Sequence, residues 1–301
     1  MTQLTRRTLL ASAAALPVAH AAQAAAPMLG ASSAIHRRFT LGDFEVTTLL
    51  AASMMRPDPH SIFGLNVDAE TFSAAADAAL LPTDQAQFYF TPTIVNTGAE
   101  LVLFDTGLNA EVITAALASA GYTPDQVDTV VITHMHGDHV GGLMDGDTPT
   151  FPNARYVTGA VEFDAWNAAG NDTFNAKMKP LAEQTTMLDA GQDAAAGITS
   201  VAAFGHTPGH MNYMLDSGGK SLLIAADFAN HYVFSLAYPD WEVKFDMDKP
   251  AAAATRRSIL DMLAADQTPF IGYHMPFPAT GFVEKRGDGF AYVPESYQLS
   301  L

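Results

Sequence analysis

Residues 132 to 142 read ITHMHGDHVGG, a segment that gathers three histidines and an aspartate into the six positions from His134 to His139. The whole chain has only ten histidines. The apolar run VVI (130–132) comes directly before the cluster, so these side chains follow the end of a buried strand. A surface would scatter such groups and a core would exclude them. Their crowding indicates a site where imidazole and carboxylate act together.

Other polar residues follow apolar strands in the same way. His206 comes after GITSVAAFG, Asp227 ends SLLIAAD and His274 ends PFIGYH. Open α/β sheets build their sites from the ends of several strands, so we expect these residues to meet the first cluster. Imidazole and carboxylate without thiolate suit zinc, iron, manganese, cobalt or nickel. Five histidines and two aspartates exceed the needs of one tetrahedral site, which predicts two metal ions that share a carboxylate.

Hydrophobic patterning predicts strands and helices in alternation along most of the chain. Strands are expected over residues 39–50, 100–105, 128–133 and 197–204, in a hairpin over 211–227 with glycines 218 and 219 at its tip, and over 268–274. Helices are expected over residues 109–121, 164–170, 173–184 and 249–267. The pattern is typical of a layered α/β domain with mixed sheets. Glycines 137, 141 and 142 are expected to let the histidine loop bend around the ions.

The N-terminus has the features of an export signal. TRRTLL (5–10) is followed by an alanine-rich apolar stretch and by small-residue cleavage sites near residues 19–24. The paired arginines predict a twin-arginine-type signal over residues 1–26, a mature domain over 27–301, and a periplasmic or secreted location. The apolar stretch is too short for a transmembrane helix, and no later segment is expected to span a bilayer.

Charge and composition limit the partners. The chain has a net charge of −17, which argues against nucleic acid or an anionic membrane as a main partner. It has no cysteine, which excludes disulfides, thiol nucleophiles and thiolate ligands. A small-molecule substrate is the remaining expectation.

HMHGDH resembles the HxHxDH signature of the metallo-β-lactamase fold, and GHTPGH (205–210), Asp227 and His274 resemble its remaining ligand motifs in the same order. The resemblance implies a four-layer αββα sandwich of two mixed β-sheets flanked by helices. It also implies a ligand set in which one metal is held by His134, His136 and His206, the second by Asp138, His139 and His274, and both by a bridging Asp227. LVLFDTG resembles the motif whose aspartate, here Asp105, supports a ligand histidine from behind.

A narrower resemblance is to the branch that includes methyl parathion hydrolase. It is carried by LGDFEVTTL, AGYTPDQVDTVVITHMHGDHVGGLM, FPNA, GHTPGHMNYML and the tail HMPFPATGFVEKRGDGFAYVPESY. The resemblance assigns Trp166 to the substrate pocket and suggests a homodimer. The segments after Gly107 and between Trp166 and Ile198 are shorter than in that branch, so ester, lactone and phosphotriester substrates all stay open.

The implied function is a hydrolase with two divalent metal ions, zinc before manganese, cobalt or iron, and a metal-bridging hydroxide that attacks an ester, lactone or phosphotriester. Asp138 is expected to hold the proton of that hydroxide and pass it to the leaving group. One alternative is a lactonase for acyl-homoserine lactones, although Asn230 stands where some lactonases of the fold carry a tyrosine. The other, from a different class, is a non-catalytic periplasmic metal-binding protein.

Several polar residues have plainer interpretations. His210 is expected to stabilise its turn by a hydrogen bond, and His36, His60 and His231 to lie at the surface or bond locally. Arg256 and Arg257 are expected on the solvated face of their helix.

Overall fold

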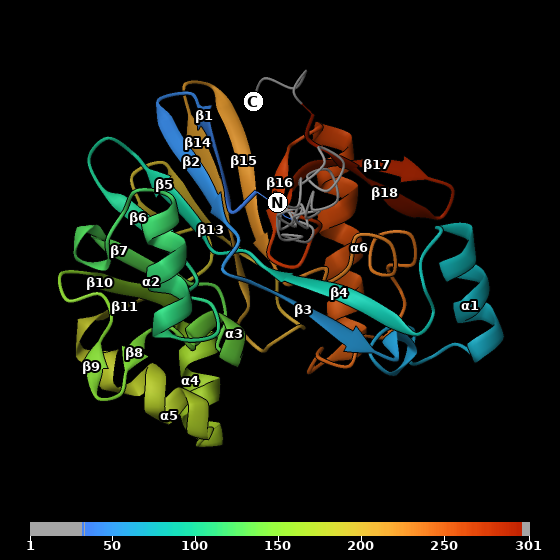
Figure 1. The fold of residues 1–301 in the computed structure, drawn as a ribbon, viewed down its shortest axis with the longest axis horizontal. Helices are drawn as coiled ribbons and strands as arrows, with labels where there is room; N and C mark the ends of the chain where they lie inside the picture. The colour runs from blue at the N-terminus through green and yellow to red at the C-terminus, as the bar shows by residue number, and fades with distance from the viewer. Residues whose placement is uncertain (1–31, 33, 297–301) are drawn as a thin grey trace, which may run out of the picture. The chain divides into compact units, whose positions relative to one another are not determined.

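The computed structural model describes residue 32 and residues 34–296, and its core is two seven-stranded mixed sheets (Figure 1). In spatial order the first sheet contains β1 (His36–Leu41), β2 (Phe44–Leu49), β5 (Thr93–Asn96), β6 (Leu101–Phe104), β7 (Thr129–Ile132), β10 (Arg155–Gly159) and β11 (Thr185–Leu188). The second contains β12 (Asp193–Ala195), β13 (Ile198–Ala202), β14 (Met211–Ser217), β15 (Lys220–Ala226), β16 (Phe270–Gly272), β17 (Thr280–Arg286) and β18 (Gly289–Pro294).

Helices and two short hairpins complete the described chain. The helices are α1 (Ala69–Ala78), α2 (Ala110–Ser119), α3 (Gly137–Val140), α4 (Ala160–Ala169), α5 (Asp172–Lys177) and α6 (Lys249–Asp266), with 3-10 turns at Pro59–Ser61, Pro124–Gln126 and Lys179–Gln184. Strands β3 (Ala52–Pro57) and β4 (Gln85–Phe90) form one antiparallel pair, and β8 (Met144–Asp145) and β9 (Thr148–Pro149) the other.

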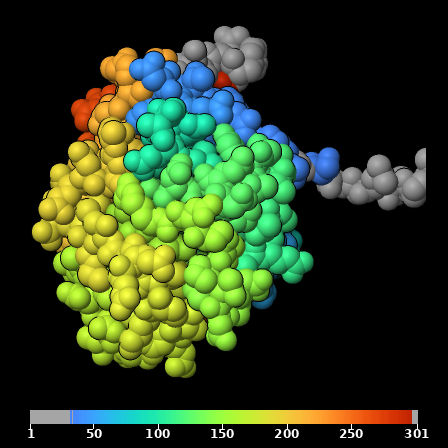
Figure 2. Space-filling model, turned by 90° about the vertical axis from the view of Figure 1, so that its left-hand side faces the viewer, coloured from blue at the N-terminus to red at the C-terminus, as the bar shows by residue number. Residues whose placement is uncertain are grey.

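The alternation of side chains along the first sheet separates two cores. Val102, Phe104 and Val131 pack inward against the second sheet, whereas Leu103 and Val130 pack outward beneath α2, α4 and α5. The face in Figure 2 is mostly the green to yellow part of the chain, which includes α2, α4 and α5 of this outer layer. Helix α6 covers the second sheet and completes four layers, so the predicted αββα sandwich is confirmed.

Local sequence explains where the long helix α6 begins and ends. The Asp248 side chain accepts a hydrogen bond from the Ala251 N–H, and Pro250 occupies the first turn, where its missing N–H costs nothing. The chain leaves the helix at Gln267 in the left-handed region, with φ of 52°. The predicted helix over 249–267 agrees with these bounds.

The predicted strand over residues 39–50 is not continuous. It is the hairpin β1–β2, turned at Gly42, whose φ is 57°. A Cβ at Gly42 would lie 2.2 Å from the Ser217 carbonyl oxygen, so the turn packs against the tip of the β14–β15 hairpin.

From Ala34 onward, the described residues form one compact unit. The export signal predicted over residues 1–26 and its boundary at residue 27 lie outside the described residues. Within the described part of the chain, none of the helices combines the length and the hydropathy that crossing a membrane requires.

Candidate metal centre

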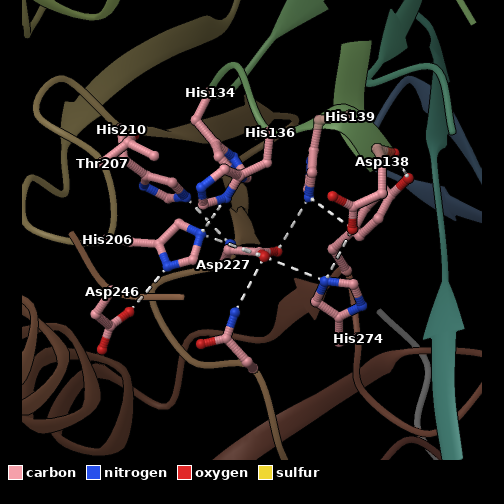
Figure 3. Close-up of polar contacts among 12 residues, drawn as sticks. His134, His136, Asp138, His139, His206, Thr207, His210, Asp227, Asp246 and His274 are labelled. Atoms are coloured by element: carbon pink, nitrogen blue, oxygen red, sulfur yellow. Dashed lines mark hydrogen bonds and ion pairs between the residues drawn. The ribbon is translucent and has the colours of Figure 1, made fainter. Parts of the chain in front are cut away.

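All seven predicted ligands lie together at one edge of the two sheets (Figure 3). The segment that follows β7 supplies His134, His136, Asp138 and His139 from the first sheet. The loop after β13 and the ends of β15 and β16 supply His206, Asp227 and His274 from the second. The centre therefore lies where the two sheets meet.

Three imidazoles form the first group of candidate ligands. The His136 Nδ1 lies 3.0 Å from the His134 Nε2 and 3.0 Å from the His206 Nε2. Nitrogens bound about 2.1 Å from a tetrahedral zinc ion lie roughly 3.4 Å from each other, so this spacing is close to that of one face of such a site.

Asp227 lies between the first group and a second one (Figure 3). Its Oδ2 is 3.5 Å from the His206 Nε2 and 3.1 Å from the His274 Nε2, and its Oδ1 is 3.4 Å from the His139 Nε2. The Asp138 Oδ2 lies 3.4 Å from the His274 Nε2 and 3.7 Å from the His139 Nε2. Asp138, His139 and His274 thus converge as the second group, and Asp227 faces both.

The outward nitrogens of three of these histidines are held by oxygen acceptors. The His139 Nδ1 bonds Asp105 (2.8 Å), the His206 Nδ1 bonds Asp246 (2.9 Å) and the His274 Nδ1 bonds the Tyr89 carbonyl (2.7 Å). A proton on each Nδ1 leaves the lone pair of Nε2 directed at the centre, as in metal sites generally. The buried His139 Nε2 and Asp227 Oδ1 make no hydrogen bond, which fits atoms shaped to bind a cation.

The histidine pKa values differ between the three-histidine group and the group of Asp138, His139 and His274. Burial and the neighbouring imidazoles lower the pKa of His134 well below its ordinary value and lower that of His136 to about 3. Burial opposes the charged form of His274 as well, but Asp227 and Asp138 outweigh it and raise that pKa to about 10. Burial likewise opposes a charged Asp138, yet His139 and His274 lower its pKa to about 2. The carboxylates therefore attract positive charge to the second group, and metal ions would compete there with protons.

The backbone is strained where two strands end at the centre. Asp105 has φ of 59° and Ala226, directly before Asp227, has φ of 44°. A left-handed conformation costs a residue with a Cβ about 1–2 kcal/mol. The fold tolerates this strain at the two positions that direct the carboxylates of Asp105 and Asp227 toward the candidate ligands.

The structure corrects our explanation of the loop glycines. A Cβ at Gly142 would lie 2.2 Å from the Thr106 carbonyl oxygen, and one at Gly141 would lie 2.2 Å from the Leu108 carbonyl oxygen. These two glycines let the histidine loop pack on residues 106–108, not on the ions, and Gly137 has space for a side chain.

Glu162 is a buried carboxylate that sequence reasoning missed. Its Oε1 accepts the Met135 N–H (2.9 Å), between two ligand histidines, and its Oε2 accepts the Thr207 hydroxyl and the Gly209 N–H (2.8 Å each). Burial raises its pKa. From helix α4 it therefore joins the two loops that carry the three-histidine group. A lone glutamate in a helix gives no local signal of this role.

The prediction that Arg256 lies on a solvated face is wrong. Arg256 is fully buried, and its guanidinium bonds Asp246 (2.7 Å), the acceptor of the His206 Nδ1, and the Phe228 carbonyl (3.0 Å). A buried arginine is stable when its donors are all paired, and this one supports a ligand through Asp246. Arg257 is half-exposed and pairs with Asp240, as expected of an outward side chain.

Other neighbours orient the ligand carboxylates. The His210 Nε2 accepts the Asp227 N–H (3.1 Å), so its hydrogen bond reaches beyond its own turn. The Asn230 amide donates to the Asp227 Oδ2 (3.0 Å), and the Tyr273 hydroxyl donates to the Asp138 carbonyl (2.6 Å). His231 is buried and bonds locally, to the N–H groups of residues 233 and 234.

A cavity of about 320 Å³ opens onto the centre. Its lining consists of Arg56, Phe88, Phe90, Leu108, His136, Gly137, Asp138, Asp227, Phe245 and His274. Trp166 lies beside the centre, edge-on to His136 with ring centroids 5.7 Å apart, but is not part of this lining. Its contact with substrate stays a prediction.

Comparison with known proteins identifies relatives over much of the chain. A family model described as the metallo-beta-lactamase superfamily matches residues 91–274. The probable metallo-hydrolase YflN of Bacillus subtilis is 26% identical over 175 residues, which are 52% of this chain and 65% of YflN. The lactamase-like protein nscB of Arthroderma gypseum is 28% identical over 149 residues, 48% of this chain and 41% of nscB. The chain thus spans less than two thirds of either relative.

Solved structures share the arrangement of the sheets. One is AidC, a dizinc quorum-quenching lactonase in complex with a product, with a TM-score of 0.80, 23% identity, and coverage of 87% of this chain and 98% of AidC. Another is AbOPH, a hydrolase of the beta-lactamase superfamily, with a TM-score of 0.81, 23% identity, and coverage of 89% and 99%. At this identity the likeness is one of fold.

Proposed function

Because the chain belongs to the metallo-beta-lactamase superfamily, whose model matches residues 91–274, we propose that it is a hydrolase with two divalent metal ions that cleaves ester, lactone or phosphotriester bonds of small molecules. The observation that carries the proposal is the arrangement of seven ligand atoms in two groups around Asp227. The acceptors behind His139, His206 and His274 support it, since they present Nε2 lone pairs to the centre.

His134, His136 and His206 would hold one ion, Asp138, His139 and His274 the other, and Asp227 both. Zinc suits this donor set best, and manganese, cobalt or iron would also fit. Two such ions, when bound, supply hydroxide at neutral pH, because they lower the pKa of water from about 15.7 toward about 7, and they polarise the oxygen of the substrate.

Asp138 has the position that proton transfer requires. Its side chain is 24% exposed and lines the cavity, whereas His139 and Asp227 are buried. Its Oδ2 faces the centre at 3.4 Å from the His274 Nε2. A carboxylate there can hold the proton of the attacking water and deliver it to the leaving group. Full activity of Asp138→Asn with both metals bound would exclude this role.

Carbonyl and phosphorus substrates are each supported by one observation. The fold shared with the lactonase AidC favours lactones, including acyl-homoserine lactones, although Asn230 here bonds Asp227 and presents no phenol. The motifs that resemble the methyl parathion hydrolase branch favour phosphotriesters.

Three matched substrates test the proposal: an aryl ester, an aromatic lactone and a dimethyl aryl phosphotriester. We expect the metal-loaded protein to hydrolyse at least one, a chelator to abolish turnover, and His206→Ala to lose it while His60→Gln keeps it. Phosphotriester turnover within about tenfold of the others, roughly 1.4 kcal/mol in barrier, would indicate an organophosphate hydrolase. Stoichiometric metal without turnover of any substrate would favour the non-catalytic metal-binding alternative.

We also propose that the protein is exported to the periplasm or secreted and forms a homodimer. The twin arginines at residues 6 and 7 support export. Fractionation of cells that express the chain or its Arg6→Lys/Arg7→Lys variant tests export, and sedimentation tests the dimer. If the variant is exported to the same extent as the parent chain, the twin arginines are not an export signal. If the protein is a monomer at all concentrations, the homodimer is excluded.

A further inference from the structure

Among the lysines and arginines of the described residues, Arg56 is the one that lines the cavity at the metal centre. Apart from the candidate metal ligands and Gly137, the lining is apolar and consists of Phe88, Phe90, Leu108 and Phe245. Arg56 is therefore the charged side chain of this lining that is not a candidate metal ligand and that stays free to meet a substrate.

No carboxylate in the described chain pairs with Arg56. The other six arginines of residues 34–296 each form an ion pair within 4.0 Å, and these are Arg37, Arg38, Arg155, Arg256, Arg257 and Arg286. Arg56 is exposed, and its side chain has neither an ion pair nor a hydrogen bond to the described residues. The chain has 32 acidic residues and only 15 basic ones. An exposed arginine without a neighbouring carboxylate is therefore unexpected on its surface.

The β3–β4 hairpin fixes the side on which Arg56 lies. Successive side chains of a strand point to opposite faces, and on β3 Arg56 lines the metal cavity while its neighbour Met55 lines a second cavity of about 220 Å³, which shares His274 with the first. On β4, Phe88 and Phe90 face the metal cavity in the same way, while Gln87 and Tyr89 face the other. Arg56 is opposite Ala86, which offers it no polar partner.

We propose that Arg56 determines specificity by binding an anionic group of the substrate, a carboxylate distant from the bond that is cleaved. This inference rests on the proposed function and names its substrate class: esters or lactones with an apolar chain between the reacting carbonyl and a carboxylate. The chain would contact Phe88, Phe90 and Phe245, and the carboxylate would accept hydrogen bonds from the guanidinium. Water adds to the carbonyl carbon, the C–O bond to the alcohol breaks, and the alcohol leaves with a proton.

Two esters of equal length test the proposal. 4-Nitrophenyl hemiglutarate and 4-nitrophenyl pentanoate differ only in the carboxylate at the end of the acyl chain. We expect the metal-loaded protein to prefer the hemiglutarate, and Arg56→Gln to raise its KM at least about tenfold with little change in kcat, while pentanoate changes less than about threefold. Arg286→Gln, a remote variant on β17, should leave both substrates unchanged.

Binding of the matching amides provides a readout without turnover. Calorimetry should show that Arg56→Gln weakens glutaranilate but not the neutral pentananilide, and that salt weakens glutaranilate alone. Equal binding of the two amides to the parent protein, or an equal loss of both in Arg56→Gln, would overturn the role of Arg56. Selective binding of glutaranilate with no hydrolysis of either ester would keep that role and contradict the proposed hydrolase instead.

Discussion

His231 is a buried histidine that belongs to neither ligand group. It packs on the rings of Phe63 and Phe234, with centroids 5.2 and 4.4 Å away. Its Nδ1 accepts the N–H groups of Val233 and Phe234, each at 3.1 Å. Burial lowers its pKa from 6.5 to about 3, so the folded protein keeps it neutral.

This shift predicts a pH-dependent loss of stability. The folded-state pKa lies below that of the unfolded chain, so the stabilisation is complete above pH 6.5 and is lost as the pH falls toward 3. In His231→Asn, the Oδ1 can accept the same N–H groups but does not titrate. Urea unfolding at pH 7 and pH 5 should show that the parent protein loses about 2 kcal/mol more than the variant. Parallel losses would mean that His231 is protonated in the folded state.

At the scale of residues, the positions of the candidate ligands and of Asp105 were predictable, but the other residues that support them were not. His134, His206, Asp227 and His274 each follow an apolar strand, so a local pattern places each of them at the edge of a sheet. Glu162 and Asp246 act through contacts with segments 27 to 47 residues away in the chain. No local pattern encodes such a contact.

Among the elements, helix α6 connects the fold to the centre through one side chain. Arg256 bonds Asp246, which holds His206, and also the carbonyls of Phe228, Pro239 and Trp241. The ring of His206 is therefore oriented by a helix that contributes no ligand. Helix periodicity predicted α6 well but could not distinguish Arg256 from Arg257, because both are arginines in an alanine-rich helix.

Replacing Arg256 with methionine tests the importance of this connection. The substitution leaves a buried Asp246 carboxylate without its cation, and breaking a buried pair in this way costs about 3–5 kcal/mol. We expect that loss in the free energy of unfolding, measured by urea denaturation. The adjacent Arg257→Met is a matched control, because its ion pair with Asp240 is half-exposed and contributes at most about 1 kcal/mol. Similar losses in both variants would contradict a structural role specific to Arg256.

One pair of strands that escaped prediction has partners far apart along the chain. β3 and β4 pair although 27 residues, which include helix α1, separate them. The alternation of side chains along the two strands positions the walls of the cavity. The layered α/β class was predictable because β7 and β15 each contain a continuous apolar run, residues 130–132 and 222–226. The hairpin β1–β2 was missed because its turn interrupts a pattern that otherwise continues through residue 50.

For the whole molecule, the centre joins the two sheets. Four candidate ligands come from the segment after β7 of the first sheet, and three come from the second. Metal ions held by both sets would cross-link the layers, and because unfolding separates the ligands, binding stabilises the folded state of the entire domain.

Removal of metal should therefore destabilise the protein globally and not only abolish activity. With free zinc at about 100 times its dissociation constant, the stabilisation is about 2.7 kcal/mol for each ion, and a chelator should remove it. Thermal unfolding with zinc and with chelator measures the difference. His206→Ala, which removes a candidate ligand of one ion, should lose about half of the zinc-dependent shift, whereas His60→Gln should keep all of it. If zinc binds stoichiometrically but leaves the unfolding temperature of the parent protein unchanged, zinc binds the unfolded chain as tightly as the folded one, and the seven side chains do not form a site that depends on the fold.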